Sequence, residues 1–452
     1  MSLAEVEAAR RPTTVAAVPS VARPRLSAEV LLTVYLGCLY LISAKWVVAP
    51  FGAVGTPAIL VGLVAATVWL TGRLLPDVFP APSGHPVRTA VLLHAWIMGI
   101  GWVVAQLRPL TELETNGANR AMISLVALSG VALLTADGVR DRAHLDRLLR
   151  RLTVLAAVIS AIGVVQFATG WDLVARVPIP GLQLGGDIKT VGSRGSFNRP
   201  YGTTQHPIEL SVVLAMCLPI ALHYALTEGR RRRSRWVVTG LIAAGIPLTV
   251  SRSGVVAAAA ALITLGFAWP WRRRLQAMGA TVGFIALNWM FVPGLIGTFR
   301  KLFLQTEDDP SIQARLARRP KVMELFGESP WFGRGYGTFS VDDYFILDNQ
   351  YYKSLIEGGV VGILAIAALL LTGIAICVAL RRSIDRSSAH LAQALAAALL
   401  AVAVSIATFD AFFYRLFTGT MFFVLGCAGA LWRVAPRLRA GPGGSAGSMP
   451  TH

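Results

Sequence analysis

Long apolar stretches recur along this chain, and they constrain its fold more than any other feature of the sequence. A bilayer core about 30 Å thick needs roughly 20 apolar helical residues to cross it, and twelve stretches between charged segments approach that length. Composition agrees, because 54% of the residues are hydrophobic and 15% are charged, against roughly 45–50% and about 25% in soluble domains. The sequence therefore predicts an all-α polytopic membrane protein with about twelve transmembrane helices. The predicted spans are Ala28–Val48, Val54–Thr71, Val87–Ala105, Ala121–Thr135, Leu152–Thr169, Pro207–Leu226, Trp236–Val250, Gly254–Trp269, Met278–Ile296, Gly359–Leu380, Leu391–Thr408 and Leu416–Leu431.

Basic residues indicate which side each loop faces. Lys and Arg total 42 against 24 Asp and Glu, a formal charge of +18, and they gather in alternate short loops such as 230–235 and 272–274. Because short cytoplasmic loops accumulate Lys and Arg, we expect both termini in the cytoplasm. The arginine runs are then topology anchors that contact anionic membrane lipid, and nucleic acid is not an expected partner. Residues 1–27 lack the short apolar core and the cleavage site of a signal peptide, so we expect them to form a cytoplasmic tail.

This topology divides the chain into segments with two long outer loops. Few ionisable residues fall inside the spans, and those few lie near predicted outer ends, whereas an ion pathway places such groups near mid-depth. We therefore expect an outward-facing site built from the loops. The segments are a cytoplasmic tail at 1–27, nine helices with an outer loop at 170–206 in 28–296, a large extracytoplasmic loop between helices 9 and 10 at 297–358, helices 10–12 in 359–433, and a disordered cytoplasmic tail at 434–452.

The large loop has internal signals. Ser311–Arg319 reads as a short helix capped by Ser311, and Pro320 can open the next turn. A glycine-rich turn follows at 330–337, and Asp348-Asn349 precedes a helix that continues into the tenth span. The four cysteines lie in apolar stretches without metal-ligand spacing, so they read as small buried hydrophobes.

Four segments of the chain resemble, in order, the O-antigen ligase and polymerase superfamily. Arg199-Pro200-Tyr201-Gly202, followed by His206-Pro207, is similar to the family's "R-x-x-G…P" segment before a helix. Thr249-Val250-Ser251-Arg252-Ser253-Gly254 looks like its "T-x-S-R-x" turn. Arg315, fifteen residues before the turn that begins at Pro330, resembles its loop arginine. Asp348-Asn349 followed by Gly359 and Gly362 fits the pattern "H-N-x9-G-x-x-G" except at its first position.

The resemblance implies a membrane enzyme that moves glycans from polyprenyl-diphosphate carriers. The donor would be a polyprenyl-diphosphate-linked glycan and the acceptor a glycan or lipid-glycan. Where ligases of the family carry a histidine, this chain has Asp348. "D-N" at this place looks more like capsule and exopolysaccharide polymerases, so polymerase is favoured over ligase.

Transfer from a lipid diphosphate requires charge neutralisation at the leaving group, which arginine supplies through a planar fork of hydrogen-bond donors. Arg252 and Arg315 are the first candidates, and Arg199, Arg194 and Arg334 are secondary contacts. The alternatives to phosphate binding are a purely structural ion pair for Arg252 and a solvent-exposed helix face for Arg315. No acidic pair with a third ligand sits beside the motifs, so we expect metal-independent chemistry without a cofactor.

Asp348 has two open interpretations. It is the candidate base for the acceptor hydroxyl, although its ordinary pKa of about 3.9 makes it weaker than histidine; alternatively it only caps the helix. His206 is the substitute base because histidine titrates near neutral pH. Asn349 and Tyr352 are expected at the substrate, although aromatic residues are common at membrane interfaces. A transporter or lipid flippase and a non-catalytic assembly partner remain alternatives.

Overall fold

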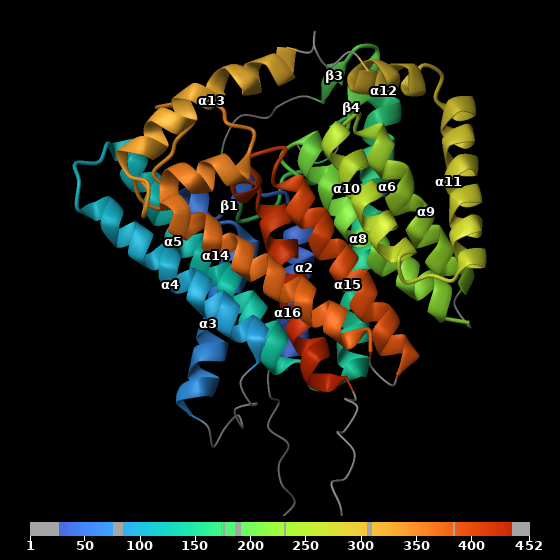
Figure 1. Ribbon diagram of the computed structural model, residues 1–452, viewed down its shortest axis with the longest axis horizontal. Coiled ribbons are helices and arrows are strands. Elements are labelled where there is room, and N and C mark those ends of the chain that lie inside the picture. The colour runs from blue at the N-terminus through green and yellow to red at the C-terminus, as the bar shows by residue number, and fades with distance from the viewer. Residues whose placement is uncertain are drawn as a thin grey trace, which may run out of the picture.

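The computed structural model describes residues 27–75, 85–172, 174, 177–185, 191–229, 232–304, 310–382 and 385–435. Both predicted tails fall almost entirely outside these ranges. The described part is a bundle of helices with two short antiparallel strand pairs (Figure 1). The helices are α2 Ala28–Leu41, α3 Pro57–Leu74, α4 Pro86–Gln106, α5 Glu112–Gly138, α6 Arg142–Thr169, α8 Pro207–Thr227, α9 Arg232–Leu248, α10 Arg252–Gly266, α11 Trp271–Phe291, α12 Leu295–Leu304, α13 Pro310–Glu328, α14 Gln350–Leu380, α15 Arg386–Ser405 and α16 Arg415–Val434, with 3-10 turns η1 at Ala49–Val54 and η2 at Ala411–Phe413.

Each of the twelve predicted spans falls on a different helix, which confirms the all-α prediction and the integral membrane character. Among the described residues, eight helices are long and apolar enough to cross a membrane, or nine if α11 and α12, which meet at a bend of 115°, form one broken span. The apolar helices α2 and α10 are shorter, with 14 and 15 residues. The number twelve therefore stays a prediction.

Among the helices long enough to span a membrane, α8 and α16 are the most buried. In each, 83% of an 18-residue apolar stretch is buried inside the protein. Their neighbours approach closely because small residues line the contacts. A Cβ on Gly426 of α16 would lie 2.6 Å from the carbonyl oxygen of Ala132 in α5. In a bilayer, such close packing is a main source of helix association, so α16 is fixed at the centre of the bundle.

One end of the bundle, here named the loop end, carries α12, α13 and the strand pair β3–β4 (Figure 1). Strand β3 (Gly192–Arg194) pairs with β4 (Phe197–Arg199), and β1 (Trp46–Val47) pairs with β2 (Gln183–Leu184). The prediction of a separate helix that ends at Arg319 is wrong, since α13 runs as one helix from Pro310 to Glu328 with Pro320 inside it. Apolar contacts of α13 compensate for the lost hydrogen bond: Val322 and Leu325 are buried against Ile356.

Helix α14 is interrupted at Gly359, whose φ of +59° lies in the left-handed region. The glycine-rich turn packs onto this break: Val360 N–H donates to the carbonyl of Pro330 at 2.9 Å, and Val361 N–H to that of Trp331 at 3.2 Å. A Cβ on Gly359 would lie 2.5 Å from the backbone of Trp331. The predicted helix after Asn349 is thus confirmed, and its glycines serve to dock the turn.

Candidate active site

The first turn of α14 lies beside α13, and this contact pairs two predicted site residues. Arg315 Nε lies 3.5 Å from Asp348 Oδ2. Arg315 Nη2 also donates to the carbonyl oxygen of Thr408 at 3.1 Å. The two side chains keep 30% and 33% of their surface exposed. An arginine and a carboxylate therefore stand together where a ligand can reach both.

The capping interpretation of Asp348 is wrong, because the structure gives that role to the next residue. Asn349 Oδ1 accepts the N–H groups of Tyr351 and Tyr352 at 3.0 and 3.2 Å, which is N-cap geometry. Asp348 precedes the cap with φ +53°. Aspartate and asparagine tolerate this left-handed conformation better than most residues, so the carboxylate is left available for another role.

Asp410 binds the backbone at the start of α14 and was not among the predicted site residues. Its Oδ1 accepts the N–H of Asn349 at 3.0 Å. Burial raises the pKa of the Asp410 carboxyl above its ordinary value, against the opposing charge of Lys353. Its position at the outer end of a predicted span was the only sequence signal. Asp410 thus fixes the backbone that carries Asp348.

Gln350 adds a second attachment between the same two segments. Its N–H is shared between the carbonyls of Ile406 and Phe409, at 2.9 and 3.1 Å. Its Oε1 accepts the N–H of Phe412 at 2.9 Å. The start of α14 and residues 406–414 therefore form one hydrogen-bonded unit.

The Asn349 cap leads to a stability prediction. We expect Asn349→Ala to lower the free energy of unfolding by about 0.5–2 kcal/mol, the usual value of an N-cap. Asn349→Ser should stay close to wild type because serine caps comparably well. Thermal unfolding of the detergent-purified variants measures the difference. Identical unfolding of the alanine and serine variants would show that this cap contributes nothing.

A second group of predicted residues meets where β4 approaches the segment before α10. Arg199 Nε donates to the carbonyl of Thr249 at 3.3 Å. Burial, together with the nearby Arg194 guanidinium, lowers the pKa of Arg199 to about 10. Arg252 Nη1 donates to the carbonyl of Leu302, at the end of α12, at 3.1 Å. Mutual repulsion between Arg194 and Arg199 would be relieved by an anion, so this group suits a phosphate-bearing ligand.

His206 lies at the start of α8 and caps it. Its Nδ1 accepts the N–H of Ile208 at 3.1 Å, so the neutral ring carries its proton on Nε2 and presents a donor there. This arrangement favours Asp348 over His206 as proton acceptor. The His206 ring lies 6.1 Å from that of Tyr414. Burial and the carboxylates Glu209, Asp410 and Asp348 raise the pKa of the Tyr414 phenol above its ordinary value.

Arg334 and Tyr352 make contacts that hold the loop in place. Arg334 donates to Glu328 at 2.7 Å and to the Tyr344 hydroxyl at 3.0 Å, and its own carbonyl accepts from Arg108 Nε at 2.9 Å. Tyr352 packs, half-buried, against the cluster around Val322. Their predicted contact with substrate stays a prediction. Within the described ranges, no three His, Cys, Asp or Glu side chains gather as a metal-binding group.

The bundle and its polar loop end define an integral membrane protein whose ionisable site residues gather at one end. Residues 236–367 match the family model described as O-antigen ligase, which confirms the resemblance of the chain to the O-antigen ligase and polymerase superfamily. The matched segment includes Arg252, Arg315, Asp348 and Asn349. No sequence among the curated proteins matches this chain significantly. Members of this family are enzymes that join lipid-linked glycans to acceptors.

Proposed function

We propose that this protein is a glycosyltransferase of the outer face of the cytoplasmic membrane. Its donor is a polyprenyl-diphosphate-linked oligosaccharide, and its acceptor is a glycan or lipid-glycan. The observation that carries the proposal is the Arg315–Asp348 pair at the head of α14, inside the segment that matches the O-antigen ligase model. Such a pair supplies what the reaction needs, a group that attracts phosphate and a group that accepts a proton.

The proposed reaction is a single displacement with inversion. An acceptor hydroxyl attacks the anomeric carbon of the donor, a new C–O bond forms, and the bond to the diphosphate breaks. Asp348 receives or orients the hydroxyl proton, and the polyprenyl diphosphate leaves with its electron pair. Arginine forks bind phosphate oxygens and offset the negative charge. We assign this role to Arg252 and Arg315, with Arg199 and Arg194 beside them, and route no step through a metal or a cofactor.

Polymerase is favoured over ligase because Asp348 stands where ligases carry histidine. The second candidate function, a transporter or flippase of lipid-linked glycans, predicts polar residues at mid-membrane depth or broken helices around a central site. The bend between α11 and α12 and the interruption of α14 at Gly359 are the features of the described structure that this alternative would use. The proposed site residues instead gather at the loop end.

The assay for this proposal uses purified protein in liposomes with a defined polyprenyl-diphosphate oligosaccharide. A polymerase lengthens the glycan on the lipid carrier, whereas a ligase transfers it to a separate acceptor. Movement of the intact donor between leaflets without a new glycosidic bond would instead establish the flippase. Product chain length and carrier release are read in the same reaction.

Orientation can be tested with single cysteines. We expect Val341→Cys, at an exposed position near α14, to react with a membrane-impermeant thiol reagent in intact cells, since the large loop faces outward. Arg232→Cys, exposed at the start of α9, should react only after permeabilisation, because arginine-rich segments stay inside. The parent protein gives the background of the native cysteines. Labelling of position 232 alone in intact cells would reverse the proposed topology.

A further inference from the structure

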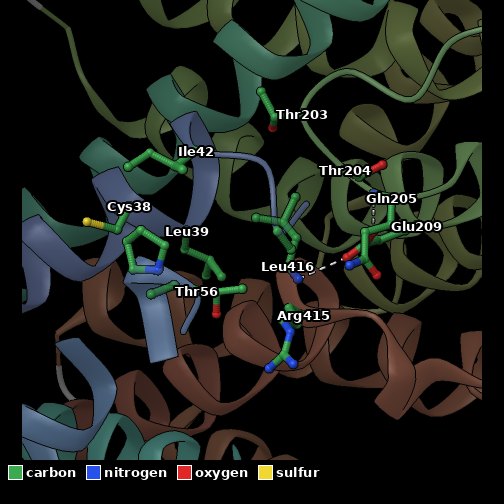
Figure 2. A pocket seen from close by; sticks show the side chains of 13 residues that line it. Cys38, Leu39, Ile42, Thr56, Thr203, Thr204, Gln205, Glu209, Arg415 and Leu416 are labelled. Atoms are coloured by element: carbon green, nitrogen blue, oxygen red, sulfur yellow. Dashed lines mark hydrogen bonds between the residues drawn. The ribbon is translucent and has the colours of Figure 1, made fainter. Parts of the chain in front are cut away.

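A buried carboxylate on α8 binds the beginning of a different helix. Glu209, 1% exposed, lies in the first turn of α8, and its Oε1 accepts the N–H groups of Leu416 and Phe417 at 2.9 and 3.2 Å. Its Oε2 accepts the N–H of Gln205 at 2.8 Å. Figure 2 shows Gln205, Glu209 and Leu416 among the residues that line a small pocket, with dashed lines from Glu209 toward Gln205 and Leu416. Glu209 therefore joins the beginnings of α8 and α16.

Helix α16 depends on this carboxylate for its cap. The first four N–H groups of a helix have no partner within the helix, and Tyr414, at the N-cap position, provides no side-chain hydrogen bond. Glu209 accepts hydrogen bonds from two of these N–H groups, although it lies 207 and 208 positions before them in the sequence. Arg415 is bonded elsewhere, to the carbonyl of Ala53 at 2.8 Å and to Ser124 Oγ at 3.3 Å.

The two helix beginnings joined by Glu209 belong to the two sides of the candidate site. The Arg199 strand leads into α8 through His206. On the other side, α16 follows Tyr414 and the segment that holds Asp410, and Asp410 in turn holds the backbone of Asn349 next to Asp348. A shift of α16 relative to α8 would therefore change the distance between the arginines near α8 and Asp348.

We propose that Glu209 is a positioning residue that sets this distance, and that it touches no substrate. The proposal rests on the proposed transferase function, because it assigns Glu209 a part in that reaction's geometry. Three hydrogen bonds from backbone N–H groups to one buried carboxyl group leave it little freedom. Its backbone partners, one just before α8 and two in the first turn of α16, distinguish it from an ordinary cap.

The test compares Glu209→Gln with wild type in the liposome assay. Glutamine keeps the shape but offers one acceptor oxygen in place of two, so one of the two helix beginnings is released. We expect kcat to fall roughly 10- to 100-fold, the scale of a small misplacement in a reacting site, while KM for the donor changes less than about twofold. Hydrogen exchange of the backbone amides at 416–417 should quicken. If this variant fails to fold, Glu209→Asp, which keeps the carboxyl group on a shorter side chain, is expected to show the same kcat loss.

The matched control is Asp385→Asn. Asp385 caps α15 by accepting the N–H groups of Ser387 and Ser388 at 3.0 Å each, and it lies in the predicted cytoplasmic segment before that helix. The same carboxylate-to-amide change there should leave kcat unchanged. An equal fall of kcat in both variants would overturn the positioning role.

A double variant separates positioning from simple loss of folded protein. If Glu209 acts through the placement of Asp348, adding Glu209→Gln to Asp348→Asn should cost less than the product of the two single effects. Fully multiplicative losses would contradict the proposal. Failure of the wild type to transfer any lipid-linked glycan would refute the transferase function itself, whereas normal wild-type transfer with unchanged turnover in Glu209→Gln would refute the positioning role alone.

Discussion

We expect Asp348→Asn to lower glycan transfer roughly 10²- to 10⁴-fold, the usual scale for a positioned proton acceptor, with the folded protein retained. Asparagine is nearly the same size, and it tolerates the left-handed backbone at φ +53°. The helix keeps its cap because Asn349 is unchanged. The substitution therefore removes the carboxylate and little else. Transfer is measured as glycan elongation per folded molecule.

Asp348→His is the informative companion variant, because it restores the residue that resembling ligases carry. We expect it to keep part of the activity lost in Asp348→Asn. Asp348→Ala is a poorer probe, since alanine disfavours the left-handed conformation and would mix backbone strain with lost chemistry. Turnover at the wild-type level in the asparagine variant would remove Asp348 from the site and transfer its role to His206.

The second large effect is expected at Arg315. We expect Arg315→Lys to lower kcat by about 10²-fold, the scale for removing one positioned donor to a developing negative charge. Lysine keeps the positive charge, but its single ammonium nitrogen does not reproduce the planar fork in which Nε faces Asp348 and Nη2 donates to the Thr408 carbonyl. The measurement is initial-rate transfer at saturating donor.

Arg319→Lys is the matched control on the same helix. Arg319 is exposed on α13, so the same change there should leave kcat within about twofold, as for a solvated surface residue. Equal losses at both positions would mean that α13 contributes only its general positive charge. Loss at neither position would place the phosphate contact on the Arg199 and Arg252 group.

The helical membrane fold could be predicted from the sequence because the bilayer imposes a simple requirement. A segment that crosses hydrocarbon must satisfy its own backbone hydrogen bonds and expose apolar side chains, and both conditions leave a long apolar run in the sequence. The predicted span Pro207–Leu226 falls on α8, Pro207–Thr227, for this reason. The resemblance to the family was likewise predicted from short local motifs, and the site roles of Arg252, Arg315 and Asp348 were predicted from the same motifs and stay predictions.

Which residues act together was decided by the tertiary structure. Asp410 accepts a hydrogen bond from Asn349 across 61 positions, and no local pattern marks such a partner. The cap could not be assigned by sequence, because aspartate and asparagine are both good caps; the turn at Asp348 decided between them. Glu209 appeared in the sequence as one acidic residue near a helix end. It became the cap of α16 only because close packing at the centre of the bundle brings the beginnings of α8 and α16 together and leaves two buried N–H groups that need an acceptor.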